Sequence, residues 1–233
     1  MFQMQSRGNI ATKFHLMQLC DSALPVGGFS FSCALESAVA QGVVHDVATL
    51  EAYASVVVRQ ALLSDGVAAL HAFRNYDNGE ELRYADEELY TRKLSREWRT
   101  MSCRMGRKLA ELGAGLMPNP SLLALRDDIL SARTLGCHAV VQGALFAACG
   151  VSEEELFSAV GYGAATMVTG AAMRLMRVSH QESQRILFAL GQRVESCYAE
   201  VAGWRLEDMQ SFAPQMEILS SLHERGHQRM FMS

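Results

Sequence analysis

The sequence lacks the excess of basic residues that is typical of nucleic-acid-binding proteins. Its 233 residues include 21 Lys and Arg against 25 Asp and Glu, which gives a formal net charge of −4. A DNA- or RNA-binding domain usually carries a basic patch or a strongly basic composition. The composition therefore argues against nucleic acid as a partner.

Paired cysteines and a leading signal are also missing. None of the six cysteines belongs to a CxxC pair, and residues 1–11 do not have the pattern of a signal peptide. Scattered thiols of this kind are typical of a reducing compartment. We therefore expect a cytoplasmic protein in which most cysteines are small core residues. The cysteines are Cys20, Cys33, Cys103, Cys137, Cys149 and Cys197.

The sequence contains no motif for nucleotide binding by a phosphate loop and none for a serine hydrolase. Gly27 and Gly28 precede a predicted helix, whose N-terminus could attract an anion, but no GxxxxGK[ST] pattern occurs and the nearest lysine is Lys13. The GxSxG nucleophile pattern is absent as well. We expect neither a Walker-type nucleotide site nor a nucleophilic serine.

Apolar residues, which make up 49% of the chain, follow the period of an α-helix almost throughout. The clearest β-branched run, 56–58, lies inside a helical pattern. The sequence therefore predicts an all-α fold, with residues 1–233 forming a single helical-bundle-like domain of about eight to ten helices. We expect the termini, 1–11 and 223–233, to be mobile until a partner binds them.

Several helix boundaries can be predicted from local signals. Asp46 is placed to cap a helix that runs on toward Phe73, and a long charged helix is predicted from about Glu80 to Leu112. Two capping boxes mark further starts, Ser152 with Glu155 and Ser179 with Glu182.

One uncharged stretch, 156–173, just reaches the length of a membrane helix, which needs roughly 20 apolar residues. Its three glycines and many Ala, Ser and Thr residues make it only weakly apolar. A buried helix packed closely on its neighbours is the better interpretation, and we expect no membrane association.

The most distinctive segment is 21–36, DSALPVGGFSFSCALE. Pro25 fixes a backbone angle, while Gly27 and Gly28 permit positive φ and let another backbone come close. Phe29 and Ser30 follow directly. A turn that only reversed the chain would not need this content. We interpret the segment as a shaped docking surface or as the close packing site of another segment.

His223-Glu224-Arg225-Gly226-His227 matches the HExxH pattern, in which two histidines one helical turn apart hold zinc and the glutamate acts as a base. Gly226 weakens the helix that the pattern needs, and the last six residues offer no third ligand. An exposed terminal helix is the plainer interpretation, and transient metal binding lies between the two. Cys137-His138 is a second candidate, for which we favour a buried thiol beside a capping or core histidine.

Several segments together resemble the urease accessory protein UreF family. An ALPVGGFS-type segment near the N-terminus is followed there by a Leu-Glu pair, and the chain closes with an FAP…HE…SRLFRS-like sequence. Relatives often carry Tyr where His227 stands, so the HExxH match reads as an accident of that position. The matching segments here are 23–30 with Leu35-Glu36, 95–112, 142–150, 174–190 and 212–233.

This resemblance implies an all-α, non-enzymatic, homodimeric scaffold in urease maturation. Members bind the accessory protein UreD, called UreH in some organisms, and with it recruit the GTPase UreG, which delivers nickel to apo-urease. The resemblance implies no stably bound cofactor; the assembled complex handles the nickel, and the family has been proposed to regulate the GTPase or to pass nickel along an internal tunnel.

Three hypotheses follow. In the first, the chain is a scaffold that uses segment 25–30 and the tail, with Phe231 as an apolar anchor for UreD and Arg229 as a charged clamp. In the second, it is a zinc-dependent hydrolase built on His223, Glu224 and His227. In the third, His or Cys side chains hand nickel over directly through weak ligation.

Overall fold

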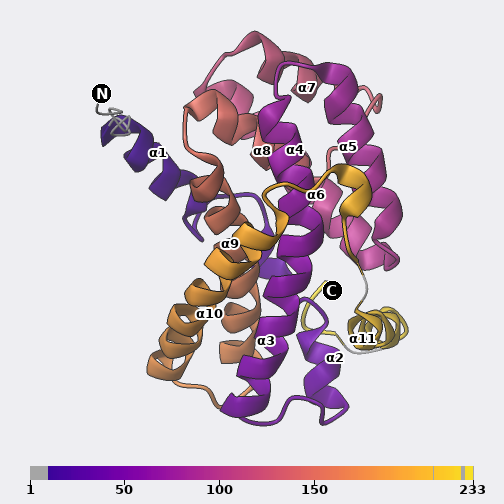
Figure 1. Ribbon diagram of the computed structural model, residues 1–233. Coiled ribbons are helices and arrows are strands. Elements are labelled where there is room, and N and C mark those ends of the chain that lie inside the picture. Colours follow the sequence, from indigo (N-terminus) through magenta and orange to yellow (C-terminus); the bar gives the residue numbers. More distant parts are fainter. Residues whose placement is uncertain (1–9, 212, 227–228, 233) are drawn as a thin grey trace.

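The computed structural model (Figure 1) describes residues 10–211, 213–226 and 229–232. Within that part of the chain there are eleven α-helices and no strand. The helices are α1 (Ile10–Cys20), α2 (Leu35–Ala40), α3 (Val47–Ala61), α4 (Val67–Arg74), α5 (Gly79–Arg92), α6 (Arg96–Leu116), α7 (Pro120–Leu130), α8 (His138–Cys149), α9 (Glu153–Leu175), α10 (His180–Val201) and α11 (Pro214–Glu224).

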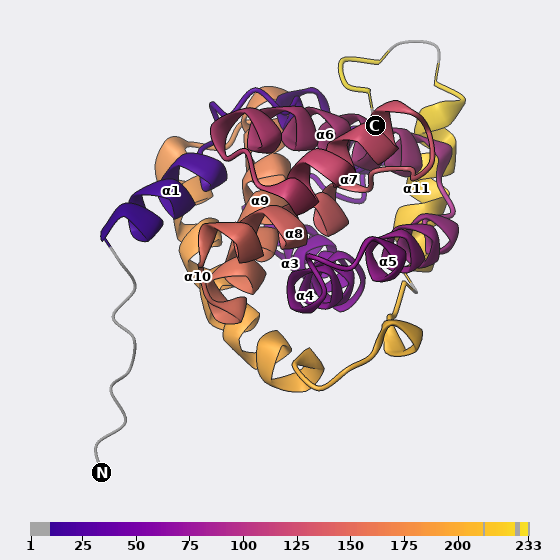
Figure 2. The same ribbon diagram turned by 90° about the horizontal axis from the view of Figure 1, so that it is seen from above.

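One long helix runs through the middle of the molecule. α3 passes into α4 through a π-helical turn, η2 (Leu62–Gly66), so the helix is continuous from Val47 to Arg74. A capping box of Asp46 and Thr49 closes its first turn, as the sequence predicts for Asp46. Figure 2 shows this helix end-on, with α9 and α10 to its left and α5 to its right.

The helix α8 packs on α4 with the two backbones in contact. Gly143 makes this possible, because a Cβ atom there would stand only 2.3 Å from the carbonyl oxygen of Ala69. Most of the described buried apolar residues of α2 to α11 join in one hydrophobic core around these helices. The close approach fixes the position of α8, and with it the position of α6, which packs on its other side.

The turn that leads into α8 is held by one buried carboxylate. Asp86 of α5 accepts hydrogen bonds from the backbone N–H groups of Leu135, Gly136 and Cys137, at 2.7, 2.7 and 2.6 Å. The hydroxyl of Thr134 donates to the same carboxylate. These bonds satisfy the backbone donors of the turn and that of Cys137, the N-cap residue of α8.

The predicted all-α fold is confirmed for the described residues. The described residues contain eleven α-helices. Because α3 and α4 are continuous, these form ten separate rods, which lies within the predicted range of eight to ten. Both predicted capping boxes, at Ser152 and at Ser179, are present. Whether residues 1–11 and 223–233 are mobile stays a prediction, and of these 1–9, 227–228 and 233 lie outside the described residues.

The predicted single helix from Glu80 to Leu112 is wrong. It is broken at 93–95 into α5 and α6. Lys93 leaves the helical conformation, and its ammonium group lies 2.7 Å from the carboxylate of Asp65 on the central helix. Ser95 then caps α6 by accepting the N–H of Trp98. A buried ion pair and a cap therefore override the continuous helical pattern.

Two described helical stretches, Val47–Arg74 and Glu153–Leu175, are long and apolar enough to cross a membrane by length and composition alone. More than half of each apolar window is buried inside the molecule. The stretch 156–173 therefore lies in a packed helix, as the sequence predicts.

The close contact at Gly143 can be tested with two glycine-to-alanine variants. Gly143→Ala places a methyl group against backbone, so we expect a loss of about 2 kcal/mol or more in the free energy of unfolding. Gly163→Ala in α9 meets open space and is expected to be neutral or to stabilise by up to ~1 kcal/mol. Urea denaturation of both variants measures the difference, and equal effects would contradict the contact.

Candidate functional site

Two segments from opposite ends of the chain meet at the C-terminal end of α9. The first is the turn that leads into η1 (Gly28–Ser30) and α2. Gly27 adopts a φ of 90°, which confirms that a glycine is needed there. Phe29 follows on the surface with 74% of its area exposed, while Phe31 is buried. The segment thus presents one aromatic ring to solvent and anchors itself with the other.

The second segment is the described part of the tail, 229–232, which lies against the first. Met232 donates its backbone N–H to the carbonyl oxygen of Ser30 at 2.9 Å. Met230 and Phe231 donate theirs to the two carboxylate oxygens of Glu36, at 2.7 and 3.0 Å. Because these are charge-assisted bonds to two successive amides, Glu36 fixes the direction of the tail.

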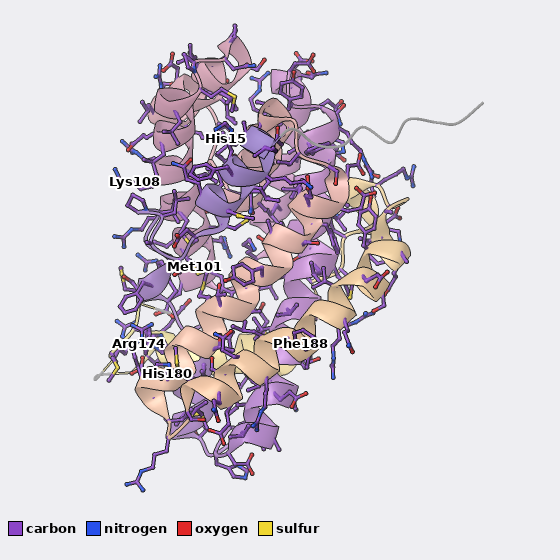
Figure 3. All side chains as sticks on the ribbon, turned by 90° about the vertical axis from the view of Figure 1, so that its left-hand side faces the viewer. His15, Met101, Lys108, Arg174, His180 and Phe188 are labelled. Carbon is purple, nitrogen blue, oxygen red and sulfur yellow. The ribbon has the colours of Figure 1, made fainter. Side chains whose placement is uncertain are left out.

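Arg174, near the end of α9, lies between the two segments. The carbon at the centre of its guanidinium group is 3.8 Å from the ring centroid of Phe29 and 4.1 Å from that of Phe231. Its Nη2 also donates to the carbonyl oxygen of Phe29 at 2.8 Å. Stacking of a cation between two aromatic rings is favourable on both faces. Figure 3 shows Arg174 on the same side of the molecule as Met101 of α6, away from Phe188 of α10.

His223 of α11 connects the same region to α6. Its Nδ1 lies 2.7 Å from a carboxylate oxygen of Glu97, and its Nε2 lies 3.0 Å from Glu36. The imidazole side chain is only 2% exposed. Arg229 of the tail contacts the other oxygen of Glu97 at 2.6 Å. A charged imidazolium ring donates from both nitrogens and so satisfies both carboxylates, whereas a neutral ring can satisfy only one.

We call these seven residues the terminal junction: Phe29, Glu36, Glu97, Arg174, His223, Arg229 and Phe231. They come from η1, α2, α6, α9, α11 and the tail. Phe231 is 4% exposed, so the tail contributes a buried ring to the junction. The contacts of the junction link these five elements and the tail to one another.

Beside the junction lies an open hollow of about 320 Å³. Of the exposed apolar side chains of the two segments, Met232 lines the hollow, while Phe29 and Met230 are more open to solvent. Its walls carry both charges on a partly apolar base. They are formed by Phe31, Arg96, Glu97, Thr100, Glu224, Arg229 and Met232.

Opposing effects act on the pKa of Glu36. Burial works to raise it, but hydrogen bonds from the amide of Met230, from His223 and from the amide of Phe231 outweigh burial, and the pKa lies below its usual value. The carboxylate is therefore the stable form over the physiological pH range, which keeps the tail bound.

The HExxH pattern does not form a zinc-binding helix in the described residues. α11 ends at Glu224, and both ring nitrogens of His223 already face carboxylates. Glu224 accepts hydrogen bonds from Ser95 and from the backbone N–H of Glu97, so it complements the positive N-terminus of α6. His227 lies outside the described residues. The described part of the motif serves packing instead.

The second metal candidate, Cys137-His138, agrees with the interpretation as a buried thiol beside a capping or core histidine. Cys137 is fully buried at the start of α8. Burial lowers the pKa of His138 to about 4, so the ring is neutral at pH 7. Among the residues that the structure describes, no group of three or more His, Cys, Asp or Glu side chains is placed to hold a metal ion.

The structure thus brings together three of the residues proposed from sequence as partner-binding, Phe29, Arg229 and Phe231, while the backbone of Ser30 receives the tail. Pro25 and Gly27 are exposed nearby. The expectation that a backbone approaches Gly28 is not met, because its neighbours are the flexible methyl groups of Met105 and Met167.

Glu97 and Arg174 are junction residues that sequence reasoning missed as site residues. Glu97 lies in a helix whose pattern is amphipathic and charged, where a charged residue is usually solvated. Arg174 follows the uncharged stretch of α9 and looks like an ordinary basic residue at a helix C-terminus. Glu36 stood only as half of the Leu-Glu pair that carries the family resemblance. No local signal connects these positions with the tail more than 50 residues away.

Comparison with known proteins gives one consistent family. A family model described as UreF matches residues 44–191. "Urease accessory protein UreF 2" of Brucella canis is 45% identical over 94% of this chain and 91% of its own length. "Urease accessory protein UreF 1" of Brucella melitensis biotype 1 is also 45% identical, over 94% and 92%. "Urease accessory protein UreF" of Yersinia pseudotuberculosis serotype IB is 37% identical, over 96% and 99%.

Removing the central ring of the junction should release the tail. His223→Ala leaves two carboxylates facing each other without the imidazole, so we expect unfolding to be easier by roughly 3 kcal/mol. We also expect faster trypsin cleavage after Arg225. Urea denaturation and limited proteolysis measure the two effects. His180→Ala, at an exposed position, is the control, and equal effects at both histidines would contradict this role.

Acid should also release the tail, through Glu36. A carboxyl whose folded pKa is depressed contributes stability that is complete above its ordinary value of 4.5 and is lost as pH falls through the folded value. We expect the rate of tail proteolysis, measured with an acid-active protease, to rise below about pH 4.5 in the natural protein. In Glu36→Gln it should be high already at pH 7 and change little with acid. A parallel pH profile in both proteins would refute this assignment.

Proposed function

Because the chain belongs to the UreF family of urease accessory proteins, we propose that it acts as a non-enzymatic maturation factor, or chaperone, for urease. In this proposal it binds the accessory protein UreD (UreH in some organisms) and with it recruits the GTPase UreG, which delivers nickel to apo-urease. Nickel is the cargo of the assembled complex, and the chain itself holds no cofactor stably.

The observation that carries the proposal is the extent of the family match. Identities of 37–45% run over 94–96% of the chain. Residues that resemble the family's N-terminal and C-terminal motifs meet in the terminal junction. Proteins named as accessory to urease are expected to need a surface that other proteins can bind.

The form of the junction supports protein binding. Phe29 offers an exposed ring, and Met230 and Met232 add adaptable apolar contacts around the hollow. Phe231 and Arg229 fix the tail beneath this surface, because Phe231 stacks on Arg174 and Arg229 binds Glu97. We propose that the exposed ring and methionines contact UreD, while the buried ring and the clamp keep them in place.

The remaining parts of the proposal follow from the family. We propose a cytoplasmic homodimer whose partners are UreD, UreG and apo-urease, with neither nucleic acid nor membrane among them. The described residues provide no observation that favours the zinc-hydrolase alternative. Direct handover of nickel by this chain is distinguished by equilibrium dialysis of nickel against the chain alone and against the assembled complex.

The central experiment is co-purification. Tagged chain is mixed with UreD-like and UreG-like proteins from the same organism, with and without GTP and nickel. Capture of UreD by the chain, and of UreG only when both are present, is the expected result. Failure to capture UreD under any condition would overturn the proposed function.

Two variants and a control test whether UreD binds at the terminal junction. Phe29→Ala should weaken UreD binding by roughly 2 kcal/mol, the loss of an interface anchor, and deletion of residues 224–233 should abolish it while the fold stays helical by circular dichroism. Phe188→Ala removes an equally exposed ring, 80% open, on another face. Titration calorimetry compares the three, and equal affinities for Phe29→Ala and Phe188→Ala would exclude the junction as the contact surface.

A further inference from the structure

The helix α6 places two arginines beside the hollow of the terminal junction. Arg96, Thr100 and Arg104 follow one another at intervals of four residues, so they lie along one face of the helix, and all three are exposed. Arg96 and Thr100 line the hollow. Arg104 Nη1 lies 3.7 Å from the sulfur of Met232, which lines the hollow as well. We call Arg96 and Arg104 the α6 arginine pair.

The acidic side chains in the walls of the hollow are already engaged within the fold. One carboxylate oxygen of Glu97 lies 2.7 Å from His223, and the other lies 2.6 Å from Arg229. Glu224 accepts hydrogen bonds from the hydroxyl of Ser95 and from the backbone N–H of Glu97. Both acids therefore serve contacts between α6, α11 and the tail.

The α6 arginine pair lacks a comparable partner. Within residues 10–211, 213–226 and 229–232, no carboxylate lies at ion-pair distance from Arg96 or Arg104. The next two cations along α6, Arg107 and Lys108, both pair with Glu111. Because the chain as a whole carries a net charge of −4, the two unpaired guanidinium groups form a local excess of positive charge.

We infer that the α6 arginine pair binds a carboxylate on an acidic segment of the UreD-like partner. The inference rests on the proposed function and specifies the chemistry of one contact in that complex. A guanidinium group can donate two parallel N–H bonds to a carboxylate, which gives the contact a defined orientation. The matching feature of the partner is an Asp or Glu that reaches the wall formed by Arg96.

The other walls of the hollow favour a protein segment over a free anion. Phe31 and Met232 contribute an apolar base next to Arg96. A small anion would leave this base uncovered, whereas a segment that carries an apolar residue beside its carboxylate covers both. The hollow is also continuous, through Met232 and Met230, with the exposed tail that the proposed function assigns to the same partner.

The charge of the pair should act mainly on the rate of association. Exposed charges at the rim of an interface steer the encounter of two proteins, and salt screens this effect. The apolar ring of Phe29, by contrast, is expected to act mainly on the rate of dissociation. The two kinds of contact can therefore be separated by kinetics.

The first test measures association of the full chain with the UreD-like partner by biolayer interferometry, at about 50 mM and about 500 mM NaCl. Arg96→Glu should slow association about fivefold or more at low salt, and the difference from the natural chain should close at high salt. Arg185→Glu, at an exposed position of α10, changes the net charge equally and should change the rate less than about twofold. Circular dichroism verifies the fold; Glu is compatible with the first turn of α6.

A second test finds the carboxylate directly. Arg96→Lys keeps the positive charge and supplies an amine, which a water-soluble carbodiimide joins to a nearby carboxyl as an amide while the carbodiimide becomes a urea. Mass spectrometry of the treated complex should show a cross-link from position 96 to an Asp or Glu of the partner. Arg185→Lys should give none.

The outcomes separate this inference from the proposed function. If the natural chain does not bind the UreD-like partner, both are overturned. If it binds, but Arg96→Glu and Arg185→Glu associate at the same rate, the inference is overturned and the proposed function stands. The same holds if no carboxyl of the partner is joined to position 96.

Discussion

A single buried imidazole holds the terminal junction together. His223 lies between Glu36 of α2 and Glu97 of α6, and each of these carboxylates uses its remaining capacity to bind the tail. Without the ring, two acidic groups would face each other in a site that is only partly hydrated. The tail is therefore bound through the same charges that fix α11, so the position of the tail depends on the position of that helix.

The terminal junction couples two segments that are far apart in the sequence. Phe29 and Phe231 are 202 positions apart in sequence and share one guanidinium group, that of Arg174. Release of the tail would remove one of the two rings that stack on this guanidinium, so the position of the tail affects the surroundings of Phe29. A surface of this kind suits a member of a family of urease accessory proteins.

The sequence was sufficient for most of the fold and for part of the site. Helix starts at Ser152 and Ser179 are local, because a capping box satisfies its own amides. The break between α5 and α6 could not be seen, since it depends on the ion pair of Lys93 with Asp65 across the core. Phe29 was found from the unusual content of segment 21–36, and Phe231 was found through the family resemblance. Arg174 was missed because the stack that gives it a role exists only after folding.

The HExxH match shows why spacing alone is weak support for chemistry. A cation at His223 would need a ring nitrogen, and both nitrogens face carboxylates that also hold the tail. Metal binding at His223 would therefore displace Glu36 or Glu97 and loosen Phe231 or Arg229 at the same time. Glu224 could not act as a base without leaving the N-terminus of α6. The residues that resemble a zinc site thus stabilise the surface, and the two uses exclude each other.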